Sequence, residues 1–377
     1  DCLTLNIWSG GSAAAGLRPV MVWIHGGAHV SGEGSGPLYD GTALAERGVV
    51  VVTINYRLGV LGFMAHPALS AESEHGVSGN YGMLDQIAAL EWVRDNIAGF
   101  GGDSTNVTIF GESAGGHSVG QLMASPLAEG LFHRAIPESG TGLQQFLHLR
   151  HAVGPTPSAE SLGLALAVSL DVVDADDPAA ALRAVDAATL VAAATTGFNA
   201  MTHPNVDGHV LPKSTFETFR AGEQAKVPLL VGTNADEGTL LYPLFKVPTP
   251  ESGVVEDLAS WTAALAASYG EHADDAAKLY PATTDAEVDA AGEQLWGDSF
   301  FGTAAWLMAR YHANAGQPAY YYLFERTPPG EGQTIGAYHA SEIPFVFGSS
   351  FPLFPTNDYD EALGEHMRDY WVRFAET

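Results

Sequence analysis

An apolar, β-branched stretch of the sequence runs directly into a serine flanked by glycines: Val107-Thr108-Ile109-Phe110-Gly111-Glu112-Ser113-Ala114-Gly115. A helical pattern follows, from Ser113 to Met123. A sharp turn between strand and helix would expose the Ser113 hydroxyl at a helix N-terminus, which stabilises developing negative charge. Side chains at the flanking glycines would clash in such a turn. The stretch therefore predicts a nucleophile elbow with Ser113 as the nucleophile.

Several other apolar runs are bounded by Gly, Asn or Pro, which is typical of buried parallel strands. With the stretch above, the predicted strands are Val20–His25, Val49–Asn55, Val107–Phe110, Val227–Gly232 and Ala319–Phe324. Helical patterns separate them, the clearest being Gly82–Ile97. This alternation predicts a mostly parallel central sheet flanked by helices, and together with the elbow it predicts the α/β-hydrolase fold.

Two segments interrupt the predicted sheet. From about Pro155 to Arg220, and again from about Glu256 to Ala315, the chain is rich in Ala, Asp and Leu and shows no strand pattern. We expect helical excursions at about 155–220 and 256–315, packed either over one edge of the sheet or as a lid over the site. No internal repeat or long linker divides the chain, so we expect a single catalytic domain over residues 1–377.

Composition excludes several classes of function. The chain is 46% hydrophobic, which is enough to bury a sizeable core, and its formal net charge is −28. This charge repels phosphate backbones and anionic lipids, so we expect no nucleic-acid partner. No apolar run approaches the roughly 20 residues that span a bilayer. Cys2 is the sole cysteine, which rules out a disulfide within the chain.

A nucleophilic serine needs a histidine base oriented by a carboxylate, and in this fold the acid precedes the histidine. The loop after the strand Val227–Gly232 offers two carboxylates, Asp236 and Glu237, and residue order does not choose between them. Among the chain's 14 histidines, His339 is the candidate base, because it follows the strand Ala319–Phe324 in a loop.

Acyl transfer also needs backbone N–H donors for the oxyanion. The loop His25-Gly26-Gly27-Ala28 follows the first predicted strand, and its small residues would let the backbone approach a substrate carbonyl. Ala114, directly after the nucleophile, would supply a further N–H group. The sequence therefore predicts an oxyanion hole between this loop and the start of the helix.

At this point the sequence resembles the type B carboxylesterases, the family of the bacterial para-nitrobenzyl esterases and the cholinesterases. The resemblance rests on motifs spread along the chain in the family's order. They are Asp1 to Asn6, Val20 to Ala28, Asn55-Tyr56-Arg57-Leu58-Gly59, Phe100-Gly101-Gly102-Asp103, Phe110 to Gly116, and His339 through Gly348.

The resemblance implies a serine carboxylesterase with an acyl-enzyme intermediate, a small-molecule ester substrate and no metal or organic cofactor. It implies Glu237 as the triad acid and assigns roles near it to further residues. These are Gly27, Ala28 and Ala114 as oxyanion donors, Glu112 as an electrostatic neighbour of the nucleophile, and Ser139 as a supporting serine. His29 stands where an aromatic residue is usual, which implies a more polar wall of the pocket.

Alternatives remain at this stage. The same fold carries non-catalytic binding or adhesion proteins, although those typically lack the serine or the histidine, and the same triad can act on carbamates, amides or lactones. Four aromatic residues could line the pocket, with core packing favoured for each: Trp296, Phe300, Phe345 and Phe347. The resemblance also implies that the chain begins and ends inside the family's pattern, without its first strands and last helices. Because the sequence starts at Asp1 in a strand-like stretch without Met, we expect that a leader segment could precede it.

Overall fold

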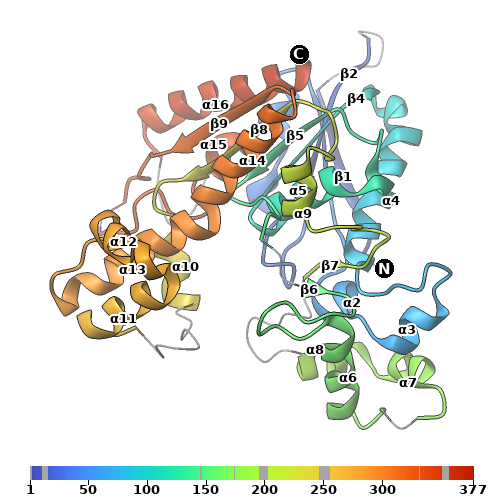
Figure 1. Ribbon diagram of the computed structural model, residues 1–377. Coiled ribbons are helices and arrows are strands. Elements are labelled where there is room, and N and C mark those ends of the chain that lie inside the picture. Colours follow the sequence, from blue (N-terminus) through green and yellow to red (C-terminus); the bar gives the residue numbers. More distant parts are fainter. Residues whose placement is uncertain are drawn as a thin grey trace.

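A seven-stranded sheet forms the centre of the protein (Figure 1). The structure is a computed structural model that describes residues 2–10, 16–144, 147–173, 175–194, 203–245, 255–330, 332–349 and 356–377. In spatial order the strands are β1 (Leu5–Ser9), β3 (Val50–Ile54), β2 (Arg18–Ile24), β4 (Gly102–Glu112), β5 (Arg134–Glu138), β8 (Leu229–Asn234) and β9 (Ala319–Phe324). Only the β1–β3 pair among these is antiparallel. The mostly parallel sheet is confirmed.

The five predicted strands are present; the structure adds β1 and β5 to this sheet, and β6 (Leu147–His148) and β7 (Asn205–Val206) form a separate pair. β5 escaped prediction because its sequence, Arg134-Ala135-Ile136-Pro137-Glu138, has two charged ends and a proline, which lacks the N–H group that a central strand normally donates. Pro137 nevertheless lies opposite Gly111 of β4 in the middle of the sheet. β5 is therefore stabilised by pairing with its neighbouring strands rather than by the β-strand propensity of its own residues.

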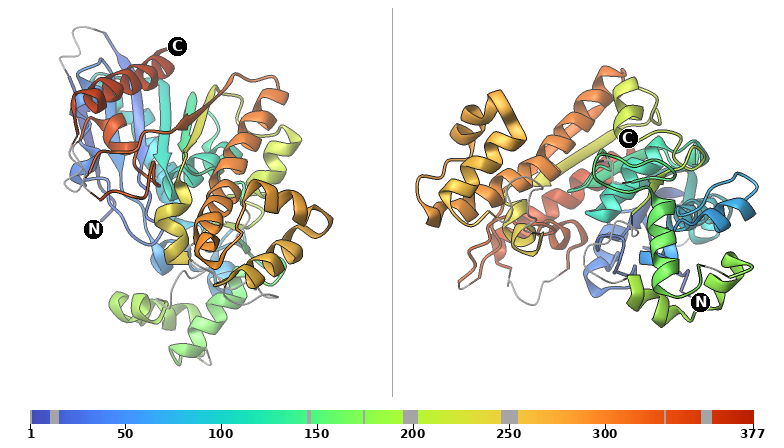
Figure 2. Two further views of the ribbon diagram at one scale, coloured as in Figure 1. Left: turned by 90° about the vertical axis from the view of Figure 1, so that its left-hand side faces the viewer. Right: turned by 60° about the horizontal axis from the view of Figure 1, so that its bottom comes forward.

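Helices cover both faces of the sheet, and alternate residues of each strand meet different layers. On one face α4 (Tyr81–Asn96), α5 (Ala114–Ala124), α9 (Thr215–Ala221) and α14 (Thr303–Asn314) enclose a core that includes Val22, Val119 and Met308. On the other face α15 (Ile343–Phe347) and α16 (Asp358–Glu376) pack on a core that includes Trp23 and Phe110. The molecule is a three-layer α/β structure (Figure 2).

Both segments predicted as helical excursions contain helices; in Figure 1 those of the first lie at the bottom, and α11, α12 and α13 of the second lie at the left. The first holds α6 (Ala159–Ser169), α7 (Pro178–Ala184) and α8 (Ala187–Ala194), and α8 packs on α2 (Gly59–Phe63). The second begins with α11 (Leu258–Tyr269), α12 (Ala273–Leu279) and α13 (Val288–Gly297). α13 packs on α10 (Glu237–Phe245), the helix that begins at the candidate acid.

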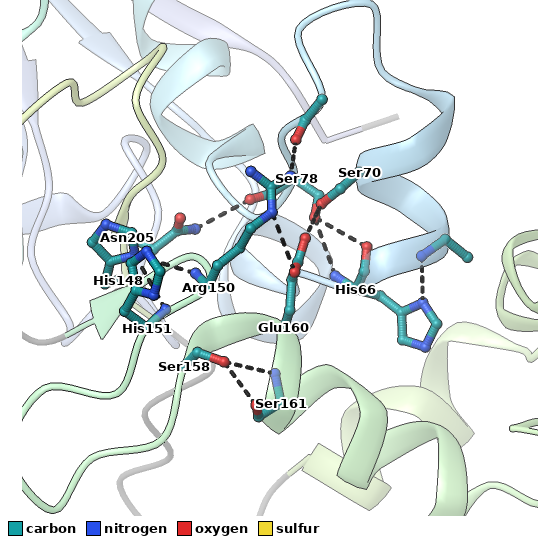
Figure 3. A network of polar contacts seen from close by, with 12 residues as sticks. His66, Ser70, Ser78, His148, Arg150, His151, Ser158, Glu160, Ser161 and Asn205 are labelled. Atoms are coloured by element: carbon teal, nitrogen blue, oxygen red, sulfur yellow. Dashed lines mark hydrogen bonds and ion pairs between the residues drawn. The ribbon is translucent and has the colours of Figure 1, made fainter.

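Hydrogen bonds and an ion pair connect α6, in the first of these helical segments, to the preceding part of the chain (Figure 3). The Ser70 hydroxyl, at the end of α3 (Pro67–Glu72), donates to Glu160 on α6 over 2.6 Å. The Arg150 side chain lies 3.6 Å from the other carboxylate oxygen of Glu160. Ser158 caps α6 by accepting the backbone N–H of Ser161. These contacts give α6 a defined position beside α3.

None of the helices in the described ranges combines the length and the apolar character needed to cross a lipid bilayer.

Candidate functional site

Ser113 lies at the corner where β4 ends and α5 begins. Its backbone adopts φ 58° and ψ −121°, a strained conformation for a residue with a side chain. Two hydrogen bonds hold it there: the Ser113 N–H donates to the Glu138 carbonyl, and the His117 N–H donates to the Ser113 carbonyl, each over 2.9 Å. The predicted strand–serine–helix corner is therefore present.

Close backbone packing explains the glycines around this corner. A Cβ atom at Gly115 would lie 1.9 Å from the Ile24 carbonyl oxygen, and one at Gly140 would lie 2.1 Å from the Ser113 carbonyl oxygen. A Cβ atom at Gly26 would come within 3.0 Å of the Ser113 Cβ. The glycine-rich loop after β2 thus packs directly against the candidate nucleophile.

Glu237 and His339 meet behind this corner, although 102 positions separate them in the chain. The Nδ1 atom of His339 lies 2.5 Å from Glu237 Oε2, while the Thr233 hydroxyl and the Asn234 N–H donate to Oε1. Burial alone would raise the pKa of Glu237, but the charge of His339 and the hydrogen bonds from His339 and the Asn234 N–H lower it below its usual value. The carboxylate is therefore ionised and fixed against the imidazole.

Asp236, the alternative acid, has a different position. Its Oδ2 atom accepts the Ala337 N–H over 2.7 Å, and its own N–H donates to the Ala337 carbonyl over 3.0 Å. These bonds tie the end of β8 to the loop that carries His339. Of the two neighbouring carboxylates, Glu237 contacts the imidazole and Asp236 supports the loop.

The other imidazole nitrogen of His339 faces a second carboxylate. Nε2 lies 3.1 Å from Glu112 Oε1, and both side chains are buried. Burial lowers the pKa of His339, but Glu112 and Glu237 together outweigh that effect and raise it to about 9. In the described part of the chain, no hydrogen bond joins the Ser113 hydroxyl to His339, whose Nε2 atom faces Glu112 instead. Burial raises the pKa of the Glu112 carboxyl to about 8. Catalytic hydrogen bonds are often incomplete before substrate binds.

The residues predicted as oxyanion donors flank the corner on its other side. Gly27 and Ala28 lie in the loop after β2 with φ values of 97° and 55°, and Ala114 is the first residue of α5. Within the described ranges, the N–H groups of Gly27 and Ala28 donate to no other group. Donors in this state can bind an oxyanion without first breaking a hydrogen bond.

Ser139, predicted as a supporting serine, is fully buried with φ 44°, and its N–H donates to the Gly232 carbonyl over 2.9 Å. Its hydroxyl also contributes to lowering the pKa of Glu237. The serine therefore joins β5 to β8 directly behind the candidate acid.

Two further buried carboxylates at the site were not predicted. Asn234 donates to Glu342 Oε2 over 2.6 Å, and the Trp371 indole donates to Glu138 Oε1 over 2.9 Å. Burial raises the pKa of both carboxyl groups, and their mutual repulsion adds to the effect for Glu138. A sequence signal existed: each glutamate borders an apolar segment that is too hydrophobic to be exposed.

The aromatic candidates divide between core and site. Phe345 and Phe347 belong to the core beneath the sheet, in agreement with core packing. Trp296 and Phe300 stack on each other with ring centroids 5.0 Å apart. Phe301 is the aromatic residue against the candidate base, with its ring centroid 4.7 Å from that of His339. No pattern in the sequence distinguishes Phe301 from Phe300.

The described residues contain no group of three or more His, Cys, Asp or Glu side chains arranged to hold a metal ion.

Comparison with known proteins identifies close relatives. The model of the carboxylesterase family matches residues 1–377. The chain is 41% identical to fumonisin B1 esterase of Sphingopyxis macrogoltabida and 37% identical to para-nitrobenzyl esterase of Bacillus subtilis (strain 168). Each alignment covers 100% of this chain, with 68% and 74% of the respective relative. A solved structure of PNB esterase matches with a TM-score of 0.79 at 35% identity, over 100% of this chain and 76% of that one.

Proposed function

Because the chain belongs to the carboxylesterase family, it is a carboxylic-ester hydrolase, and we propose that Ser113, His339 and Glu237 are its nucleophile, general base and orienting acid. One observation carries this assignment: the buried hydrogen bond between His339 and Glu237, beside the strained serine corner. A carboxylate at Nδ1 sets the tautomer and orientation of the ring and leaves Nε2 to exchange a proton with the serine.

The reaction begins from the form in which the His339 imidazole has lost its Nε2 proton to solvent. Nε2, turned from Glu112 toward Ser113, then accepts the hydroxyl proton. The serine oxygen then forms a bond to the ester carbonyl carbon, and the carbonyl oxygen becomes an oxyanion. The N–H groups of Gly27, Ala28 and Ala114 bind this charge. The intermediate collapses with cleavage of the bond to the alcohol, which takes the proton from His339. Water, deprotonated by the same imidazole, releases the acid from Ser113.

Glu112 and Ser139 influence the reaction through their contacts with the triad residues His339 and Glu237. Glu112 faces the imidazole in the free enzyme and favours its charged form when its own carboxyl group, whose pKa burial raises to about 8, is ionised. Ser139 supports the carboxylate of Glu237. The substrate is a small ester, and with a net charge of −28 we propose no nucleic-acid partner.

A single substitution tests the assignment. Ser113→Ala should lower kcat for a short-chain para-nitrophenyl ester by about 10⁵-fold or more, the scale seen when a serine nucleophile is removed. A fluorophosphonate probe should label the unaltered protein on Ser113 and should not label the variant. A folded Ser113→Ala protein with undiminished turnover would refute the proposal.

A further inference from the structure

One buried side chain joins the two segments that carry the proposed oxyanion donors. His29 directly follows Ala28 in the loop after β2, and its Nε2 atom lies 3.1 Å from the hydroxyl oxygen of Ser118. Ser118 is on α5, one helical turn after Ala114. The His29 ring also forms a hydrogen bond with the Ala114 backbone. The imidazole therefore connects the donor Ala28 to the helix that begins with the donor Ala114.

A third residue extends this contact into the core. The side-chain amide of Gln86, on α4, donates to the Ser118 hydroxyl oxygen over 3.0 Å. The exposed fractions are 2% for His29 and 0% for both Ser118 and Gln86. A polar group buried this deeply cannot replace a lost partner by water, so each of these contacts is costly to break. We call these three residues the His29 network.

The loop after β2 needs such contacts because its backbone is strained. Ala28 and His29 are consecutive residues in the left-handed region, with φ values of 55° and 59°. Residues with a Cβ atom disfavour this conformation and hold it only where surrounding contacts fix it. The Gly59 N–H donates to the His29 carbonyl over 2.6 Å, and the His29 ring packs 5.2 Å from the Phe63 ring between centroids. Together with the bond to Ser118, these contacts hold Ala28 in its conformation.

The His29 ring is neutral. Burial lowers its pKa well below the usual value, the charges of nearby histidines lower it further, and the hydrogen bond with the Ala114 backbone opposes this effect. A neutral imidazole has one donor and one acceptor nitrogen, and it has two hydrogen-bonding partners here, Ser118 and Ala114. His29 is therefore suited to fix the geometry of its surroundings rather than to exchange a proton.

Oxyanion stabilisation depends on where the donors lie relative to one another. Each N–H group must lie about 2.7–3.1 Å from the position that the oxyanion takes, and a displacement of about 1 Å can cost about 10²-fold in rate. Gly27 and Ala28 come from one segment of the chain and Ala114 from another. Their spacing is set by the contacts between the loop and α5, and the His29 network is one of those contacts.

We propose that His29, through Ser118 and Gln86, is a positioning residue that sets the spacing between the oxyanion donors of the loop and the donor at the start of α5. This inference rests on the proposed function, because it takes the backbone N–H groups named there as the oxyanion donors. It assigns no proton transfer to the three residues of the network.

Two substitutions break the network at different links. His29→Phe keeps a ring without nitrogen atoms, and Ser118→Ala removes the hydroxyl on which the two other side chains converge. Acylation and deacylation both pass through an oxyanion, so both steps should slow together. For a short-chain para-nitrophenyl ester we expect each variant to lower kcat about 10- to 100-fold and to keep KM within about 2-fold of its original value.

The double variant shows whether the two residues act as one unit. If they do, combining His29→Phe with Ser118→Ala should lower kcat by no more than about 3-fold beyond the more damaging single variant. Independent effects would multiply instead.

Ser125→Ala is the matched control. Ser125 is the C-cap of α5, at the opposite end of the helix from the oxyanion donor, and its buried hydroxyl donates to the Val210 carbonyl over 2.7 Å. Its removal should destabilise the fold about as much as the removal of the Ser118 hydroxyl, because each deletes one buried hydrogen-bonding group. The control should nevertheless keep the original kcat.

A pair of ketones separates the oxyanion contacts from general packing. Trifluoroacetophenone adds to a serine nucleophile and forms an oxyanion, whereas acetophenone binds without adding. In His29→Phe and Ser118→Ala, the inhibition constant of trifluoroacetophenone should rise by about the factor by which kcat/KM falls. The inhibition constant of acetophenone should stay within about 2-fold of its original value.

Three results would overturn the inference: an unchanged kcat in a folded single variant, losses that multiply in the double variant, or an unchanged inhibition constant of trifluoroacetophenone. Either single variant tests kcat and the ketones if the other does not fold. All three results leave the proposed function intact as long as Ser113→Ala abolishes ester hydrolysis. Hydrolysis that persists in Ser113→Ala would instead refute the proposed function itself.

Discussion

The Nε2 atom of His339 lies 3.1 Å from Oε1 of Glu112, the residue that directly precedes Ser113. The candidate base therefore lies between two carboxyl groups, because Glu237 contacts its other nitrogen at 2.5 Å. The pKa of Glu237 is lowered, whereas burial raises the pKa of Glu112 to about 8. This arrangement keeps a proton on the imidazole in the free protein. Before it can act as a base, the ring must lose that proton and turn toward the serine.

Replacing Glu112 by Gln should change the pH dependence of the reaction. The pKa of His339 is raised to about 9 by Glu112 and Glu237 against the opposing effect of burial. A base must be neutral to act, so kcat/KM should rise with pH through this pKa. Without the Glu112 charge, the rising limb should move down by about 1 to 3 pH units.

The measurement is kcat/KM from pH 5 to 10 for both proteins. Glu91→Gln removes the same charge from an exposed position on α4 and should leave the profile unchanged. An unshifted limb in Glu112→Gln would show that the contact between Glu112 and His339 does not govern the base.

Replacing Glu237 by Gln should lower kcat by about 10³- to 10⁴-fold, because a neutral amide neither stabilises the imidazolium nor sets the ring tautomer. Asp236→Asn retains an oxygen that can accept the Ala337 N–H and should cost less than about 10-fold. Steady-state kinetics on the two variants separates the neighbouring acids. Equal losses in both would contradict the assignment of Glu237.

Replacing Gly115 by Ala should destabilise the fold as well as the site. The added Cβ would lie 1.9 Å from the backbone oxygen of Ile24, which cannot move without shifting β2. We expect a loss of about 3 kcal/mol in the free energy of unfolding, measured by urea denaturation. Gly99→Ala, where nothing lies within 4 Å, should change it by no more than about 0.5 kcal/mol.

Replacing Glu138 by Gln should stabilise the protein increasingly as pH rises. Burial, with Glu342 and Glu112, raises the pKa of this carboxyl well above 4.5 in the folded state, so folding favours its protonated form. Its contribution to stability is full below pH 4.5, falls as pH rises above that value, and is lost as pH passes the folded-state pKa.

Gln keeps an oxygen that can accept the Trp371 indole N–H and carries no titrating group. The melting temperature of Glu138→Gln should therefore match that of the unaltered protein near pH 4 and exceed it at pH 8. A difference that stays constant between these two pH values would show that Glu138 does not titrate as the structure indicates.

Much of the site could be predicted because its signals are local. A β-branched run that ends in Gly111-Glu112-Ser113 encodes both a strand and a corner, since glycine is required wherever a Cβ would strike the backbone. The same reasoning located the loop after β2. His339 was found by its place after β9, because the carboxyl ends of parallel strands lie on one edge of the sheet.

The sequence could not determine which side chains from distant segments of the chain contact each other. Asp236 and Glu237 are equivalent by residue order, and the fold separates them by directing one toward Ala337 and the other toward His339. The contact between Glu112 and His339 has no local pattern either.

The sequence by itself determined the strand–serine–helix corner, because steric rules act between residues adjacent in the chain. Only the tertiary structure decided which groups surround that corner. His203 reaches His29, and Glu342 reaches Asn234, because sheet order and helix packing bring together segments more than 100 positions apart. The free energy of burying those polar groups depends on all of their neighbours at once, and no short stretch of sequence encodes it.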